Sequence, residues 1–246
     1  MSRRPAARGN RRGSFASTPT PAGYFGANLG LWLDPTRGIV RAGATMTSWT
    51  DQAPVSNADD MTAVGGVEPT FVADDGGFPA INFVPAQRFT TPGSADIRST
   101  AAWSFAIWLK QAANTNQEYF YADDSAPQSR SLRFPAGSSI PTVEANGGAS
   151  SVPASGVTLN TWAHVVWVFD GSLAIGSRGQ FYLNGTAVAT TNTSLPAALA
   201  VPTGSAGLGA YVGGGSPFDG RMGEVVITKH AMTLADVNFL YNRQRR

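Results

Sequence analysis

The chain has 246 residues, of which 42% are hydrophobic and only 14% are charged, compared with roughly 25% charged residues in typical soluble domains. It contains no cysteine, which excludes disulfide bonds, thiolate metal sites and a cysteine nucleophile. No apolar run approaches the roughly 20 residues that span a bilayer, and no apolar segment follows the N-terminal arginines, so we expect neither a membrane anchor nor a signal peptide.

The first 23 residues are predicted to form an extended basic arm. Apart from Met1 and Phe15 this segment lacks large apolar side chains, so it cannot bury enough surface to fold alone. It contains five arginines and no acidic residue: Arg3, Arg4, Arg8, Arg11 and Arg12.

The body of the chain has the opposite charge. Three further arginines lie within the last four residues, and the remaining ten basic residues face all sixteen acidic ones, so the body is mildly acidic. The arm can therefore contact nucleic-acid phosphates, lie on the acidic surface of a neighbouring subunit such as a second copy of this chain, or stay solvated. No aromatic residue is interleaved with the arginines for base stacking, so we favour the assembly interpretation over nucleic acid.

Short strands are predicted after the arm. Every second residue from Trp103 to Leu109 is large and apolar, and a period of two indicates a strand with one buried face. Similar short runs occur at 29–35, 78–84 and 117–123.

A central strand and a hairpin are predicted in the second half. The strand 162–170 is largely apolar on both faces, which indicates that it lies between two layers. Within 180–189, Asn184 and Gly185 separate two apolar runs, and both residue types accept positive φ, so they predict a type I′ turn. A glycine-rich stretch at 204–220 and a strand at 221–229 follow.

One helix is predicted near the C-terminus. Thr233 is a suitable N-cap, and Asp236 three residues later is close to a capping box. The apolar residues Val237, Leu240 and Tyr241 then fall on one face. Many short strands and a single short helix predict an all-β sandwich in one domain.

Several segments match a known family in sequence and in order. They are SFAIWLK, then NTWAHVVWVFDG with GQFYLNGTAVA, then GLGAYVGGG with FDGRMGEVVITKHAMTLADVNFLYN. Together they resemble the laminin G-like jelly rolls of the concanavalin A-like lectin/glucanase superfamily, over roughly 29–242. The resemblance implies a jelly roll of two antiparallel sheets for residues 24–246. The shared motifs lie at 162–165, 183–185, 220–225 and 234–241.

The resemblance leaves the function open, because the superfamily includes glucanases, sugar binders, adhesion modules and viral coat components. Its glucanases carry E-x-D-x-x-E on one strand, with one carboxylate as nucleophile and one as acid/base. The glutamates here are scattered, and none has an aspartate two residues later: Glu68, Glu118, Glu144 and Glu224. We therefore expect no enzymatic activity, and a glycoside hydrolase is the least favoured alternative.

The two histidines are not expected to be catalytic or to bind zinc. His164 lies within the apolar strand 162–170 without an acid or nucleophile beside it, so we expect a packed histidine. His230 is expected in the turn before the helix, and Glu224 is expected to pin a neighbouring loop. Two histidines without a cysteine do not indicate a zinc site.

Two ligand sites are considered. Asp123 and Asp124 directly follow a strand, and the resemblance implies calcium at one rim of such jelly rolls, so this pair is the candidate calcium site. The alternative is a pair of solvated loop charges. Trp32, Trp108 and Tyr211 are candidates for stacking on sugar rings. The alternative for these aromatic residues is burial in the core or in an interface.

Taken together, these observations predict a non-catalytic component of an assembly, attached through its basic arm to other subunits. The resemblance implies the kind of module found in bacteriophage virions, made in the host cytoplasm and located in the virion, where it decorates the head or builds tail parts. The alternative is a carbohydrate-binding or adhesion module that recognises cell-surface glycans. Both functions can coexist in one virion surface protein.

Overall fold

The computed structural model describes residues 19–54, 59–92, 97–123, 130–201 and 204–243. The five arginines of the predicted arm and Asp124 lie outside these residues. Within them, no helix has both the length and the apolar character needed to cross a membrane.

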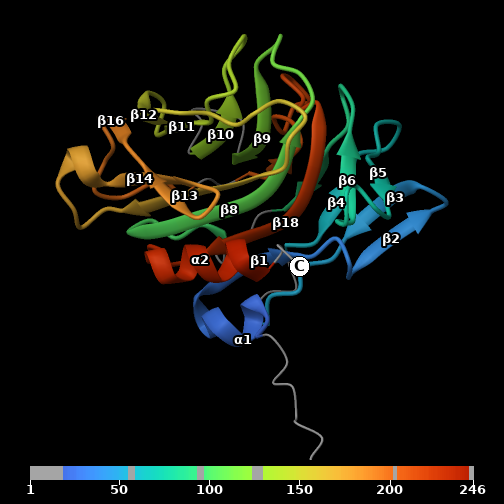
Figure 1. Ribbon diagram of the computed structural model, residues 1–246, viewed down its shortest axis with the longest axis horizontal. Coiled ribbons are helices and arrows are strands. Elements are labelled where there is room, and N and C mark those ends of the chain that lie inside the picture. Colours follow the sequence, from blue (N-terminus) through green and yellow to red (C-terminus); the bar gives the residue numbers. More distant parts are fainter. Residues whose placement is uncertain (1–18, 55–58, 93–96, 124–129, 202–203, 244–246) are drawn as a thin grey trace, which may run out of the picture.

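One antiparallel sheet, which we call the central sheet, runs through the middle of the molecule (Figure 1). Its strands pair in the order β15, β14, β13, β8 and β18, and β18 also pairs with β1 and β6. The bounds are β1 (Leu29–Leu33), β6 (Ala80–Phe83), β8 (Ala102–Gln111), β13 (Ala163–Asp170), β14 (Gly179–Leu183), β15 (Thr186–Val188) and β18 (Gly220–Thr228).

A second antiparallel sheet, the covering sheet, packs over one face of the central sheet (Figure 1). It runs in the order β16, β12, β11, β10, β9, β17, β7 and β4. The bounds are β4 (Met61–Ala63), β7 (Phe89–Thr91), β9 (Glu118–Asp123), β10 (Arg130–Phe134), β11 (Thr142–Ala145), β12 (Ala149–Pro153), β16 (Thr190–Thr193) and β17 (Ala206–Leu208).

Three short strands connect the sheets at one side of the sandwich. β3 (Thr45–Trp49) pairs with β2 (Ile39–Ala42), with β4 of the covering sheet and with β5 (Thr70–Val72), and β5 pairs with β6 of the central sheet. The described residues therefore form the predicted all-β sandwich of antiparallel strands.

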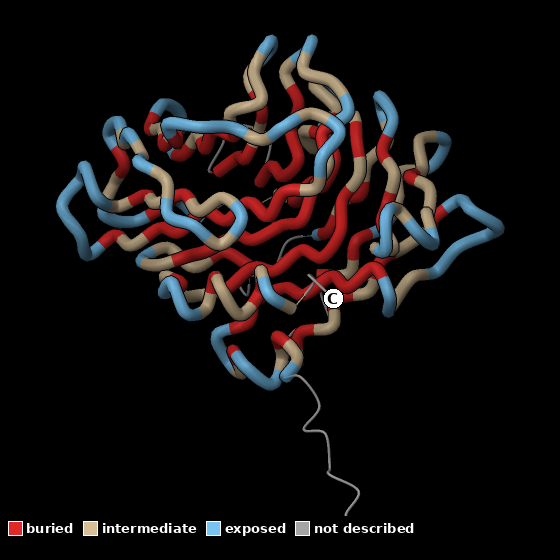
Figure 2. Tube along the Cα trace, viewed as in Figure 1, coloured by how far each residue is buried: buried red, intermediate tan, exposed pale blue. Residues whose placement is uncertain are grey.

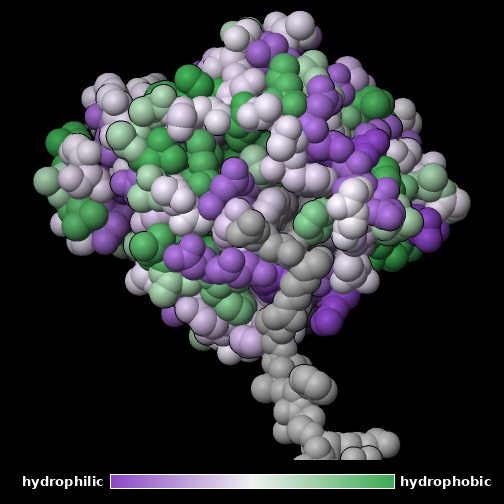
Figure 3. Space-filling view, viewed as in Figure 1, coloured by the Kyte–Doolittle hydropathy of each residue, from purple (hydrophilic) through white to green (hydrophobic). Residues whose placement is uncertain are grey.

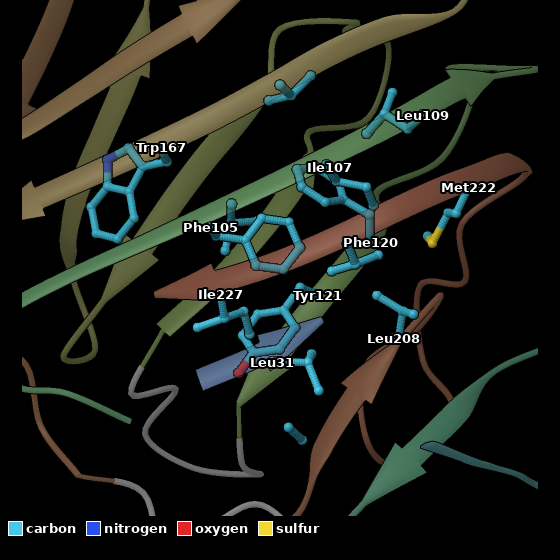
Figure 4. Packing of buried hydrophobic residues seen from close by; sticks show 14 of the residues in the cluster. Leu31, Phe105, Ile107, Leu109, Phe120, Tyr121, Trp167, Leu208, Met222 and Ile227 are labelled. Carbon is cyan, nitrogen blue, oxygen red and sulfur yellow. The ribbon is translucent and has the colours of Figure 1, made fainter. Parts of the chain in front are cut away.

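The main hydrophobic core lies between the two sheets. Phe105 and Trp167 of the central sheet share this core with Phe120 and Tyr121 of the covering sheet, and all four are fully buried (Figure 4). The predicted alternation is confirmed, since the core-facing side of β8 carries the large apolar residues from Trp103 to Leu109.

The opposite face of the central sheet is covered by helices, which creates a third layer. Val166, Val168 and Val226 pack there against Val237 and Leu240, and the tube in Figure 2 is buried along most of β8, β13 and β18. β13 therefore has core on both faces, as its sequence predicts. The helix α2 (Leu234–Arg243) supplies this cover.

Helix α2 begins as predicted. The amide N–H of Thr233 donates to Asp236 Oδ2 at 2.7 Å, and the amide of Asp236 donates to Thr233 Oγ1 at 3.3 Å. The hairpin prediction is also confirmed, because Asn184 and Gly185 between β14 and β15 have φ angles of 51° and 79°. A short 3-10 helix, η3 (Ile175–Ser177), lies in the preceding β13–β14 connection.

The described residues include a short helix that begins within the segment predicted as the arm. Helix α1 (Pro21–Phe25) starts after Thr20, whose hydroxyl accepts from the amide of Gly23 at 3.1 Å, and η1 (Gly26–Asn28) leads on to β1. The predicted boundary between residues 23 and 24 thus falls inside a helix. Phe25 stabilises α1 by packing into the hydrophobic cluster between the central sheet and the helices.

The exposed large hydrophobic residues are distributed over several segments. Figure 3 shows hydrophobic and hydrophilic residues interspersed on one face of the molecule. Because a dominant apolar patch is the usual mark of a protein interface, this face does not identify one. The exposed large hydrophobic residues of the described chain are Tyr24, Val40, Val84, Leu173, Ile175, Val201 and Leu234.

Candidate functional site

Two of the three predicted sugar-stacking residues are buried. Trp32 is 3% exposed, and its Nε1 donates to Glu224 Oε1 at 2.8 Å. Trp108 is 7% exposed and stacks between Tyr241 and Phe78, with ring centroids 5.6 Å and 6.1 Å away. The prediction is wrong for both tryptophans, because the helix layer covers a sheet face that would otherwise be open.

Glu224 has the structural role that the sequence indicates. Its Oε1 accepts from Trp32 on β1 and from Arg243 Nε at 3.1 Å. Arg243 also approaches Asp34 Oδ2 at 3.4 Å and lies over the Trp32 ring at 5.2 Å. The buried carboxylate therefore connects β18, β1 and the end of α2.

His164 is a packed residue, as predicted. It is 1% exposed, and its ring lies 5.2 Å from that of Trp108 and 5.9 Å from that of Tyr241. Burial lowers the pKa of His164 to about 3, so the imidazole is neutral at physiological pH.

The calcium prediction is contradicted at Asp123. This carboxylate is fully buried, with Arg98 Nη2 3.2 Å from Oδ1 and Arg130 Nε 3.3 Å from Oδ2. Two guanidinium groups occupy the positions that a cation would need, and their charge repels one. Among the described residues, no cluster of three or more His, Asp or Glu residues could hold a metal ion.

A pocket of about 340 Å³ lies between two loops at one edge of the sandwich. One loop, 112–117, joins β8 to β9, and the other, 209–219, joins β17 to β18. Figure 1 shows the first loop at the upper end of the molecule, away from α1 at the lower end. The polar lining residues are Thr115, Asn116, Gln117, Glu118, Ser216 and Asp219.

Backbone hydrogen bonds join the two loops. The amide of Ala112 donates to the carbonyl of Asp219 at 2.9 Å, and the amide of Tyr119 donates to the carbonyl of Ser216 at 2.9 Å. The loop 209–219 also contains a turn, in which the amide of Tyr211 donates to the carbonyl of Gly215 at 3.1 Å. The walls of the pocket are therefore held in place before any ligand binds.

Glu118 is the buried acid of this pocket. It is 2% exposed, and its Oε2 accepts from Gln111 Nε2 at 3.1 Å. Burial raises the pKa of Glu118 to about 7, against the hydrogen bond from Gln111 and with a smaller contribution from the negative charge of Asp219. The side chain can therefore exist as acid or carboxylate near neutral pH.

Tyr211 is partly exposed and lies in loop 209–219, but it is not one of the residues that line the pocket. Its ring centroid is 5.7 Å from that of Tyr119, whose hydroxyl accepts from Gln117 Nε2 at 2.7 Å. Of the three aromatic residues that the sequence singled out, Tyr211 alone lies in one of the two loops of the pocket.

Sequence reasoning missed the pairing of Glu118 with Asp219. The two acids come from opposite halves of the chain, and neither belongs to a carboxylate motif. The available signal was weaker: a polar loop, Thr115 to Gln117, that follows a buried strand, and a glycine-rich loop that precedes another.

A family model described as the concanavalin A-like lectin/glucanases superfamily matches residues 86–238, which is more than half of the chain. The chain belongs to this superfamily. The laminin G-like resemblance seen in the sequence is therefore confirmed, and both loops of the pocket lie within the matched region. No curated protein sequence matches the chain.

Solved structures of the superfamily fold are similar over most of the chain. Domain 4 of AbnA, an extracellular arabinanase from Geobacillus stearothermophilus in complex with arabinotriose, is 16% identical with a TM-score of 0.63, covering 87% of this chain and 98% of that one. Botulinum neurotoxin type C, whose cell entry depends on two ganglioside molecules, is 10% identical with a TM-score of 0.62, covering 89% and 52%.

The sialidase of Trypanosoma rangeli in complex with sialic acid is a further neighbour, 13% identical with a TM-score of 0.61, covering 93% of this chain and 34% of the sialidase. The chain thus spans about half of the toxin chain and a third of the sialidase chain. At these identities the neighbours show the shared fold alone.

Proposed function

We propose that this protein is a non-catalytic glycan-binding domain that its basic arm attaches to a larger assembly, such as a bacteriophage virion. The observation that carries the glycan-binding part is the pocket between loops 112–117 and 209–219. Its six polar lining residues supply hydroxyl, amide and carboxyl groups at one opening.

The chemistry of the pocket suits sugar hydroxyl groups. Amides and carboxylates offer donors and acceptors for hydroxyls, and the ring of Tyr211 offers an apolar face for the C–H side of a pyranose or furanose. Because the loops are already fixed by backbone hydrogen bonds, little ordering cost opposes binding. The glycan-related neighbours are consistent with this choice.

The state of Glu118 supports binding rather than catalysis. A glycosidase needs two carboxyl groups that reach the scissile bond from a cleft. Glu118 is buried and already accepts from Gln111, so its carboxyl group stabilises the pocket wall. We expect no release of reducing sugar from any oligosaccharide that the protein binds.

Replacing Asn116 or Tyr211 with Ala is expected to weaken glycan binding by about tenfold each, which corresponds to about 1.4 kcal/mol. Asn116 loses amide hydrogen bonds at the pocket, and Tyr211 loses the stacking face. A glycan array identifies the ligand, and isothermal titration measures the change. The matched control is Asn242→Ala, an exposed amide on α2. An array without hits, or equal affinities for all variants, contradicts the proposal.

The position of the folded N-terminus supports attachment through the arm. Thr20 and α1 lie at the helix-covered end of the molecule, opposite the loops of the pocket (Figure 1). The first described residues therefore lie away from the opening of the pocket.

Deleting residues 1–18, which keeps Thr20 and α1, is expected to abolish incorporation into particles or oligomers and to leave glycan affinity within twofold. Light scattering after size exclusion measures assembly, and the titration above measures binding. Unchanged assembly of the shortened chain would refute the role of the arm.

A further inference from the structure

A second pocket, of about 430 Å³, opens on the side of the sandwich formed by β2, β3 and β5. Its walls come from the segment that leads into β2, from β2 and β5 and from the residue before β6, and they include Pro35, Arg37, Arg41, Phe71 and Pro79. These strands lie at the right of Figure 1. Pro79 precedes β6 and Pro85 of the first pocket follows it, so the two openings lie at opposite ends of one strand.

Arg41 lines this pocket with a guanidinium group that uses few of its N–H donors within the protein. Its Cζ lies 4.7 Å from the centre of the Phe71 ring, and its Nη1 donates to the carbonyl of Gly43 at 3.2 Å. Stacking on an aromatic ring fixes the plane of the group without using its N–H donors. Most of its five donors therefore remain available to a ligand.

Arg37 is a second cation at this pocket, and its partner is the carboxylate of Asp34, which other groups also contact. Its Nε lies 3.7 Å from Asp34 Oδ2, and the side chain is 56% exposed. The same carboxylate accepts from the amide of Thr36 at 2.8 Å and approaches Arg243 at 3.4 Å. The lining of the pocket includes no acidic residue, so the charge at this opening is positive on an otherwise acidic body.

The geometry points to a binding site for an acidic sugar unit, one that bears a carboxylate or a sulfate. Guanidinium groups bind such oxyanions through paired N–H donors, and Phe71 with Pro79 offers an apolar wall for the sugar ring. The first pocket has the opposite character, with two carboxyl groups and no cation in its lining. This site does not depend on the first pocket, because no lining residue is common to both.

The test is isothermal titration of the full chain with three hexasaccharides: a uronic-acid oligomer, a sulfated oligomer and a neutral one. We expect at least one acidic probe to bind saturably and the neutral probe to bind at least tenfold more weakly at this site. The double variant Arg37→Gln, Arg41→Gln should bind the acidic probe tenfold or more weakly than the wild type does. The probe that binds shows whether carboxylate or sulfate is preferred.

The arm could also attract acidic probes, so the matched control removes the same charge from it by Arg3→Gln with Arg4→Gln. We expect this control to change affinity less than twofold, and Asn116→Ala to leave it unchanged. The inference would be overturned if the arm variant and the pocket variant lost the same amount of affinity for the acidic probe, or if neither lost any. A lack of binding by both acidic probes would also overturn it. Loss through Asn116→Ala alone would assign the acidic sugar to the first pocket instead.

Discussion

Replacing Asp123 with Asn is expected to lower the free energy of unfolding by about 3–5 kcal/mol. Asp123 ends β9, and both of its oxygens pair with arginines: Arg98 at 3.2 Å and Arg130 at 3.3 Å. All three side chains are at most 4% exposed. The asparagine keeps the shape and removes the charge, so each guanidinium loses the buried carboxylate that it now pairs with.

The loss of stability is large because the cluster of Asp123, Arg98 and Arg130 joins distant parts of the chain. Arg130 donates to the carbonyls of Ser99 and Ala200, each at 3.1 Å, and its Cζ lies 5.0 Å from the centre of the Trp103 ring. One side chain of β10 thereby holds the segments that flank β8 and β17. Uncompensated charge here cannot be relieved by water, because the surrounding core is closed.

The matched control is Glu144→Gln, which breaks the ion pair of Glu144 with Arg133 on the partly exposed surface of the covering sheet. Exposed pairs contribute roughly 0–1 kcal/mol. Urea unfolding of the three proteins, analysed with a common slope, gives the comparison. A loss below about 1 kcal/mol for Asp123→Asn, or equal losses for both variants, would show that the buried pairing does not stabilise the fold as argued.

The second large effect concerns acid stability. Burial lowers the pKa of His164 to about 3, whereas an unfolded chain has a histidine pKa of about 6.5. The contribution of this neutral histidine is therefore fully present above pH 6.5 and is lost as the pH falls toward 3. At 1.36 kcal/mol per pKa unit the loss over this whole range amounts to roughly 5 kcal/mol.

His164→Phe should remove this pH dependence, because phenylalanine keeps a ring beside Trp108 and Tyr241 and binds no proton. The measurement is the free energy of unfolding at pH 7 and at pH 4 for wild type and variant. Only the difference in slope matters, so other groups that titrate in the same range cancel. The control, His230→Gln, alters the other histidine, which faces Asp236 at 3.6 Å. Parallel slopes for wild type and His164→Phe would refute the account.

The fold was largely predictable because its signals are local. Alternation over 102–110, the Asn184-Gly185 turn and the capping box of α2 are each written in a few neighbouring residues. Helix α1 was missed because five residues are too few to show a helical period, although Thr20 followed by Pro21 is a usable start signal. The sequence left sugar stacking and burial open for Trp32 and Trp108, because their burial depends on helices from both ends of the chain.

The candidate site was only partly predictable, since loops from different halves of the chain build it. Tyr211 could be singled out as an aromatic residue in a glycine-rich loop. The two acids that line the pocket, Glu118 and Asp219, could not be paired from the sequence, because strand order decides which loops meet. Asp123 illustrates the reverse error: an acidic pair after a strand resembles a calcium site, but the carboxylate of Asp123 pairs with Arg130 on the neighbouring strand and with Arg98.

The most direct test of the central claim is to locate the glycan on the protein. The ¹⁵N-labelled full chain is titrated with the strongest neutral ligand from the array, and amide shifts are followed residue by residue. The proposal predicts that the shifts concentrate in loops 112–117 and 209–219, with Asn116 and Tyr211 among the largest. Shifts confined to other surfaces would contradict it.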